Sequence, residues 1–200
     1  MNTLPFFVYG SWTEGMVHFS KIKDFVVEKT DAFTLGSVYR LRVGYPIFIA
    51  GGSDRVQGQL LQLKATDFLL GILDEFHGYK PQDENRSIFF RQKIEAVDGT
   101  TQQRQEAWVY AMNPRKIPSG AELIHGGDWR QSLTEKPALT NRLTDQQKAY
   151  VQKLGISVGR EIVPINTEIY RELMRLELIV DKGRRLGLSK LGQEVFRYLP

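Results

Sequence analysis

Cysteine is absent from this 200-residue chain. Its absence excludes disulfide bonds, thiolate metal ligands and a cysteine nucleophile. Histidine is scarce as well, and His18, His77 and His125 show none of the H-x-x-x-H spacing that metal sites use. The sequence therefore predicts neither a metal site nor another cofactor.

Long apolar runs are also missing. No stretch of the chain approaches the ~18 apolar residues that a membrane-spanning helix needs. The first ten residues, MNTLPFFVYG, lack the basic start and the long apolar core of a signal peptide. We expect a cytoplasmic protein with no membrane partner.

The charge balance shows no strong excess of one sign. The chain has 27 Lys and Arg against 23 Asp and Glu, and most of the small basic excess lies after residue 143. There Arg171 and Arg175 alternate with Glu168 and Glu172, which is typical of an ion-paired, solvated helix face. This pattern argues against a nucleic-acid partner, because a nucleic-acid reader gathers Lys and Arg on one face. The composition does not indicate an oligomeric state.

What is present in the first 143 residues is a series of short apolar runs separated by glycine. Such runs are typical of strands in a curved sheet or barrel. One helix is expected from Thr66 to about Phe76, with Leu69, Ile72 and Leu73 on its apolar side. The expected strands are Leu4–Tyr9, Phe33–Arg42, Pro46–Ala50, Arg55–Leu63, Ile88–Val97 and Glu106–Met112. The prediction is an α+β fold: a small curved mixed β-sheet or barrel with a helix across it.

The pattern changes after residue 143. Thr144 and Gln147 form a capping box for a helix to about Leu154, and a second helix is expected over residues 167–177. Residues 178–188 suggest a β-hairpin, and Ser189 is placed to cap a last helix. This order resembles the last part of a winged-helix domain. We therefore predict two domains, residues 1–143 and a C-terminal helical extension with a hairpin, residues 144–200.

Several separated segments then carry a resemblance to a known family. They occur in one order: Phe7–Trp12 with Gly15, Gly44–Pro46, Val56–Leu60, Leu73–Tyr79, Phe90–Arg91, Ala107–Tyr110 and Gly127–Arg130. They are similar to the F-x-Y-G-[ST]-L, Y-P, V-x-G-E-L, L-D-x-[FY]-E-G and S-G-D-W-R motifs of the gamma-glutamylcyclotransferase-like (AIG2-like) family. The resemblance covers about the first 130 residues.

The resemblance implies a chemistry and a site. In the family, the α-amine of a gamma-glutamyl group attacks its own γ-carbonyl, so that 5-oxoproline forms and the other amine leaves. Because the nucleophile is intramolecular, proximity supplies much of the rate. The resemblance implies that Tyr9, Gly10, Ser11 and Trp12 form the substrate-binding loop and that Tyr110 lines the pocket. The alternative for the loop is a tight turn after a buried strand.

One position departs from the family. His77 stands where the family keeps its catalytic glutamate, the general base and acid. An imidazole can accept and return a proton near neutral pH, so His77 is the candidate catalytic residue. The alternative is a helix-end residue in a fold that has lost the activity. The neighbouring carboxylates, Asp74 and Glu75, are expected to be solvated, and Trp12 replaces the family's leucine.

Three functions stay open from the sequence. The chain could be a gamma-glutamylcyclotransferase-like enzyme acting on a gamma-glutamyl amine or peptide. It could be a catalytically inactive binding module that holds a small gamma-glutamyl or amino-acid-like ligand in the same pocket. It could also be an interaction protein that contacts a partner through its basic C-terminal tail.

Overall fold

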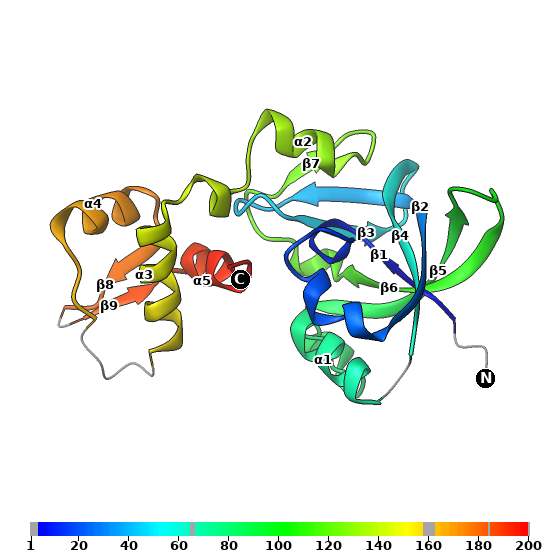
Figure 1. Cartoon of the computed structure of the whole chain (residues 1–200), viewed down its shortest axis with the longest axis horizontal. Coiled ribbons are helices and arrows are strands. Elements are labelled where there is room, and N and C mark those ends of the chain that lie inside the picture. The colour runs from blue at the N-terminus through cyan, green and yellow to red at the C-terminus, as the bar shows by residue number, and fades with distance from the viewer. Residues whose placement is uncertain (1–3, 65–66, 158–162, 184, 200) are drawn as a thin grey trace. The chain divides into compact units, whose positions relative to one another are not determined.

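The computed structural model describes residues 4–64, 67–157, 163–183 and 185–199 (Figure 1). Internal contacts divide the chain into two compact units. One comprises Met1–Leu41 and Tyr45–Glu135, and the other comprises Arg42–Gly44 and Lys136–Pro200. The domain boundary expected at residue 143 stays a prediction.

The first unit is built on one strongly curved β-sheet (Figure 1). Among the described residues its strands are β1 (Phe6–Val8), β2 (Val26–Arg40), β3 (Pro46–Ala50), β4 (Asp54–Leu63), β5 (Phe89–Asp98), β6 (Arg104–Met112) and β7 (Glu122–Ile124). Five of them, in the order β2-β4-β1-β6-β5, close into a barrel because β5 also pairs with β2. β1 and β6 run parallel, and the other pairings are antiparallel. The predicted α+β fold with a small mixed barrel is confirmed.

The long strand β2 makes the closure possible. It has 15 residues and pairs with β4 along most of its length, while Ala32–Thr34 also pair with β5. Its last residues extend the sheet by pairing with β3 and β7. The sequence predicted only the part from Phe33 onward. The preceding segment, Val26–Asp31, is mostly exposed and rich in charged residues, so its sequence shows no apolar alternation. Backbone hydrogen bonds to β4 hold it in the sheet.

Helix α1 (Asp67–His77) covers the apolar core of this unit. It buries Leu69, Leu73 and His77, spaced four residues apart on one face. Leu69 and Leu73 join a core formed by β1, β4, β6 and the loop after β1, to which Phe6, Trp12, Ile22, Leu61 and Tyr110 belong. The expected N-cap at Thr66 lies outside the described residues. Helix α1 thus presents its C-terminal residue, His77, to the loop that follows β1.

A short helix, α2 (Trp129–Glu135), was not expected from the sequence. Asp128 precedes it and accepts a hydrogen bond from the Gln131 backbone N–H at 3.0 Å, which is the interaction of an N-cap. Trp129 is buried, with its ring centroid 6.1 Å from that of Tyr45. Seven residues are too few to show a repeated apolar stripe, so only the Asp cap signalled this helix.

The second unit contains α3 (Asp145–Ile156), α4 (Thr167–Arg175), α5 (Lys190–Arg197) and the hairpin β8 (Ile179–Asp181) with β9 (Leu186–Leu188). The Thr144–Gln147 capping box is present. The Ser189 hydroxyl accepts the Gly192 N–H at 2.9 Å and caps α5. The order of helices and hairpin agrees with the sequence pattern. The likeness to a winged helix stays a prediction.

Candidate functional site

The loop after β1 is a tight turn fixed by glycine. Gly10 has φ +59°, and a Cβ placed there would lie 2.3 Å from Pro46 Cγ. Both the dihedral angle and the close approach exclude other side chains. The Tyr-Gly-Ser segment and the Tyr-Pro segment of the sequence therefore meet at this contact.

Tyr9 ties the loop to two strands. Its hydroxyl donates to the Tyr110 carbonyl at 3.1 Å and accepts the Phe48 N–H, also at 3.1 Å. Phe48 lies in β3 and Tyr110 in β6. The loop is therefore held from both sides by backbone groups of the sheet.

Ser11 has a histidine partner that the sequence did not reveal. His18 Nδ1 lies 3.0 Å from Ser11 Oγ, and the His18 backbone N–H donates to the Ser11 carbonyl at 2.9 Å. Both side chains are buried, with His18 only 1% exposed. The pair therefore links the start of the loop to the residues that follow its reversal. No sequence motif marked His18, because its contact depends on the reversal of the chain between residues 12 and 17.

His77 lies in an aromatic cluster. Its ring stacks on Tyr110 with centroids 4.0 Å apart and planes 4° apart, and it lies 5.4 Å from the Trp12 ring at 28°. Nδ1 lies 2.8 Å from the Leu73 carbonyl oxygen. Because a carbonyl can only accept, Nδ1 donates the proton of this hydrogen bond, and the contact fixes the orientation of the ring.

The cavity beside this cluster is very small. Its volume is about 20 Å³, and Tyr9, Trp12, His77 and Tyr110 line it together with apolar side chains such as Phe6 and Leu73. The structure thus brings four of the six predicted site residues to one place. Gly10 and Ser11 do not line this cavity. The catalytic and substrate-binding roles of all six stay predictions.

The hydroxyl group of Tyr110 is hydrogen-bonded to a carboxylate of α1. Its hydroxyl donates to Asp74 Oδ1 at 2.6 Å, and Arg91 Nη1 donates to Asp74 Oδ2 at 3.2 Å. Burial first, and then the hydrogen bond to Asp74, raise the pKa of Tyr110 far above its ordinary value. Tyr110 therefore stays protonated. Asp74, expected to be a solvated helix-end carboxylate, is instead an ion-pair partner that is mostly shielded from solvent.

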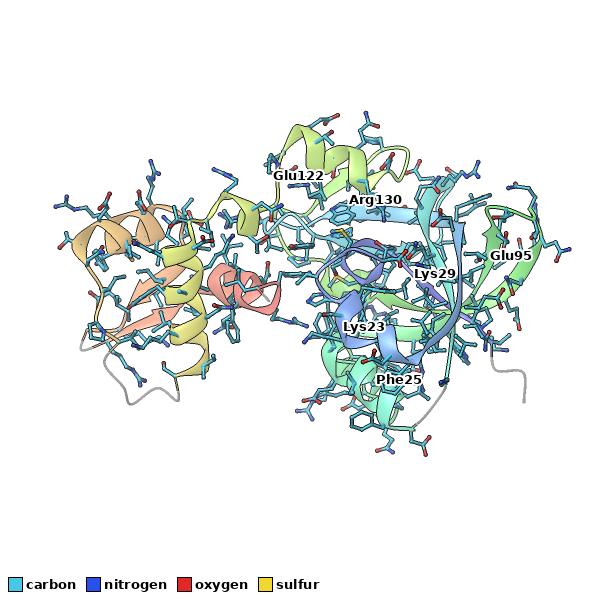
Figure 2. All side chains as sticks on the ribbon, in the orientation of Figure 1. Lys23, Phe25, Lys29, Glu95, Glu122 and Arg130 are labelled. Carbon is cyan, nitrogen blue, oxygen red and sulfur yellow. The ribbon has the colours of Figure 1, made fainter. Side chains whose placement is uncertain are left out.

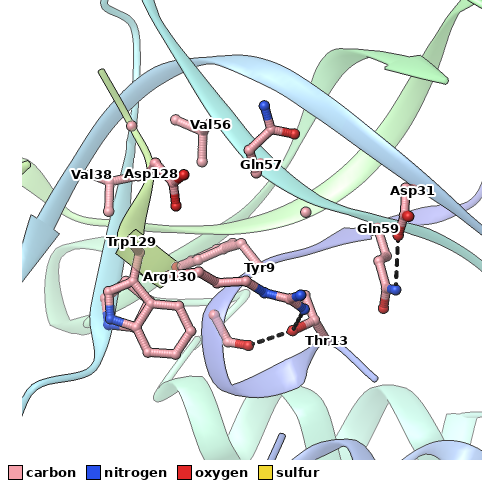
Figure 3. Close-up of a pocket in the computed structure, with 14 residues that line it drawn as sticks. Tyr9, Thr13, Asp31, Val38, Val56, Gln57, Gln59, Asp128, Trp129 and Arg130 are labelled. Carbon is pink, nitrogen blue, oxygen red and sulfur yellow. Dashed lines mark hydrogen bonds between the residues drawn. The ribbon is translucent and has the colours of Figure 1, made fainter. Parts of the chain in front are cut away.

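A second, larger cavity touches the same loop (Figure 3). Its volume is about 270 Å³, and its walls come from the loop, β2, β4 and the start of α2. Its polar side chains are Thr13, Asp31, Gln57, Gln59, Asp128 and Arg130. We call it the polar pocket; of the residues that line it, only Tyr9 also lines the smaller cavity.

Hydrogen bonds hold the polar side chains of this pocket in place. Arg130, which extends from α2 (Figures 2 and 3), donates to Thr13 Oγ1 at 3.2 Å. Gln59 Nε2 donates to Asp31 Oδ1 at 3.1 Å, and Gln59 Oε1 accepts the Glu14 backbone N–H at 2.8 Å. The sequence matched Gln59 and Arg130 to family motifs but gave no reason to place them in one pocket.

Within the described ranges, no three His, Asp or Glu side chains come together as possible metal ligands. Likewise, no helix among the described residues combines the length and the apolar character needed to cross a membrane.

Comparison with known proteins extends these observations. No curated protein matches the chain. Solved structures to which the chain is similar include YkqA from Bacillus subtilis (TM-score 0.49, 17% identity, covering 66% of this chain). An Arabidopsis thaliana protein, At3g28950.1, has TM-score 0.47, 20% identity and coverage of 82% of this chain and 93% of its own. An AIG2-like protein of Mus musculus has TM-score 0.46, 15% identity and coverage of 60% and 82%.

The present chain spans only 41% of the length of YkqA. The match that identifies the family is the one in sequence, since it covers well over half of the chain and includes the barrel, the loop after β1, α1 and the start of α2. Over residues 6–131 the chain matches the model of the gamma-glutamyl cyclotransferase, AIG2-like family, and it belongs to that family.

Proposed function

We propose that this chain is a catalytically inactive member of its family that holds a small amino-acid-like ligand without cyclising a gamma-glutamyl amine. One observation carries the absence of turnover: the cavity beside the family's acid-base position has a volume of only about 20 Å³. Trp12, His77 and Tyr110, which are 7%, 8% and 5% exposed, fill the space around it.

The reaction needs more room than this. A cavity needs a volume of roughly 10–15 Å³ to hold a single water molecule. A gamma-glutamyl group is several times larger than a water molecule, and its α-amine must also reach the γ-carbonyl. Because the filling side chains are aromatic rings packed in contact, admitting the group would require their displacement.

The proton transfers also lack the family's carboxylate. A general base must lie within about 2.6–3.2 Å of the group whose proton it takes.

The alternative function is an active enzyme in which His77 Nε2 serves as that base. The hydrogen bond from Nδ1 to the Leu73 carbonyl supports this alternative, because it holds the imidazole ring in a fixed orientation.

The test is an assay of 5-oxoproline release from gamma-glutamyl dipeptides at saturating concentration. We expect no release above the uncatalysed rate and no change on His77→Ala. His125→Ala is the matched control, because His125 lies exposed in a loop. Turnover by the unmodified protein that is lost in His77→Ala and kept in His125→Ala would establish the active enzyme instead.

A further inference from the structure

We propose that the polar pocket binds a free α-amino acid as its zwitterion, with the carboxylate on Arg130 and the ammonium group at Asp31. The inference rests on the proposed function and adds the place of binding and the class of ligand. It locates the ligand away from His77, in the cavity bounded by the loop after β1, β2, β4 and α2.

The size of the polar pocket suits a small metabolite. Its volume of about 270 Å³ is more than ten times that of the cavity beside His77. Pockets for drug-sized ligands hold roughly 300–1,000 Å³, so this one suits a ligand at or below the small end of that range. An amino acid with a side chain of a few atoms meets this condition.

Arg130 is oriented by a directional chain of hydrogen bonds. The Thr13 hydroxyl uses its only proton to donate to the Gly10 carbonyl at 2.8 Å, so its oxygen is the acceptor for Arg130. Thr13 is 3% exposed and cannot easily turn away. A guanidinium has five N–H donors, and its planar fork matches a carboxylate. The contact with Thr13 therefore positions Arg130 and leaves donors for a ligand carboxylate.

Asp31 supplies the opposite charge. Its carboxylate is held by Gln59, which is itself held by the Glu14 backbone N–H. An ionised carboxylate accepts about four hydrogen bonds, so one bond from Gln59 leaves capacity for an ammonium group. Figure 3 shows Asp31 and Gln59 on β2 and β4, with the guanidinium of Arg130 directed toward this side of the pocket.

The mixed charge selects the ligand. Asp31, Asp128 and Arg130 give the pocket two carboxylates and one guanidinium. A simple anion would be repelled by the carboxylates, and a simple amine would leave Arg130 unmatched. A zwitterion satisfies both charges at once. Asp128 is already engaged as the cap of α2, which favours Asp31 as the partner of the ammonium group.

The test is isothermal titration of the full chain with L-glutamine at pH 7 and low salt. Two comparison ligands each remove one charge: 5-oxoproline has a carboxylate and no free amine, and n-butylamine has an ammonium group alone. We expect L-glutamine to bind at least tenfold more tightly than either. Equal binding of 5-oxoproline or of n-butylamine would overturn the zwitterion assignment, as would the absence of L-glutamine binding.

Two variants locate the site. Arg130→Gln removes the cation, and Asp31→Asn removes the anion while keeping an acceptor for Gln59. Since a hydrogen bond between charged groups is worth a factor of about ten or more in affinity, each should weaken L-glutamine binding about tenfold. Arg86→Gln is the control, because Arg86 is an arginine whose side chain is 74% exposed and lies outside the pocket. Unchanged binding in Arg130→Gln and Asp31→Asn would overturn the inference.

Failure here can be separated from failure of the proposed function. If L-glutamine binds equally well to all three variants, the chain still holds an amino acid and only the location is wrong. If the unmodified protein releases 5-oxoproline in the assay above, the proposed function is wrong whatever this titration shows.

Discussion

The loop after β1 touches two cavities that differ in kind. Beside His77 the space is small and aromatic, about 20 Å³ between Trp12, His77 and Tyr110. Near Arg130 the space is polar, about 270 Å³, with side chains held by hydrogen bonds. The family motifs are present around both. The difference teaches that a motif preserves backbone geometry, whereas the volume of a site depends on the few side chains that fill it.

Reopening the aromatic cavity should have the largest effect. The double variant Trp12→Leu, His77→Glu restores both residues that the family motifs carry. We expect it to release 5-oxoproline from gamma-glutamyl dipeptides, because a positioned general acid and base contributes about 10²–10⁴ in rate. His77→Glu alone should stay inactive, since Trp12 still fills the space. A single variant as active as the double would show that the volume of Trp12 is not the obstacle.

Removing Trp12 altogether should reveal how firmly it packs. Trp12→Ala deletes a ring that contacts Phe76 and His77 with centroids 4.8 and 5.4 Å away. Emptying such a buried site costs about 3–5 kcal/mol of unfolding free energy. Phe68→Ala is the control, because Phe68 is 70% exposed and should cost within about 0.5 kcal/mol. Urea unfolding measures both, and equal losses would contradict the packing described for Trp12.

Tyr110 offers a test through pH. Tyr110→Phe removes the hydrogen bond to Asp74, and we expect a loss of about 1.5–3 kcal/mol near pH 7. The folded-state pKa of Tyr110 is raised, so its contribution is complete below the ordinary tyrosine pKa of ~10. Above pH ~10 the unfolded chain releases this proton while the folded chain keeps it, so stability falls as pH rises. Tyr110→Phe should therefore lose less stability than the unmodified protein between pH 9 and 11. Urea unfolding at each pH measures this difference. If the unfolding free energies of the two proteins fall in parallel between pH 9 and 11, the raised pKa of Tyr110 is contradicted.

The smallest effect concerns the polar pocket. Gln59→Glu restores the residue of the family's V-x-G-E-L motif but places a second carboxylate about 3 Å from Asp31. At the dielectric of a solvated site the repulsion is about 1 kcal/mol. We expect this loss of unfolding free energy at low salt and a smaller loss in about 1 M salt, because salt screens the repulsion between exposed charges. A loss that is the same at both salt concentrations would show a packing defect instead of a charge effect.

The two cavities also differ in how far the sequence predicted them. Short apolar runs with glycine between them predicted the barrel, because alternation and turn residues are local signals. The order of the motifs pointed to six residues, of which Tyr9, Trp12, His77 and Tyr110 lie around one cavity and Gly10 and Ser11 do not line it. The small volume of the aromatic cavity could not be predicted, because it depends on how the rings of Trp12, His77 and Tyr110 are oriented, and these residues are far apart in the chain.

The polar pocket had weaker signals. Arg130 and Gln59 were noticed only as motif positions, and Asp31 lies in the charged half of β2 that showed no apolar pattern. Their proximity depends on the register that places Asp31 opposite Gln59. A register between strands almost thirty residues apart is fixed by the closed barrel and not by either segment alone.

Nuclear magnetic resonance of the indole N–H groups compares the two cavities directly. The chain has three tryptophans, and one lines each cavity: Trp12 the aromatic one and Trp129 the polar one. Each signal is assigned by a Trp→Phe variant, and L-glutamine is then titrated into the unmodified protein. The account predicts that the Trp129 signal shifts with saturation while the Trp12 signal stays in place. A shift of Trp12 with Trp129 unchanged would place the ligand in the aromatic cavity and contradict the account.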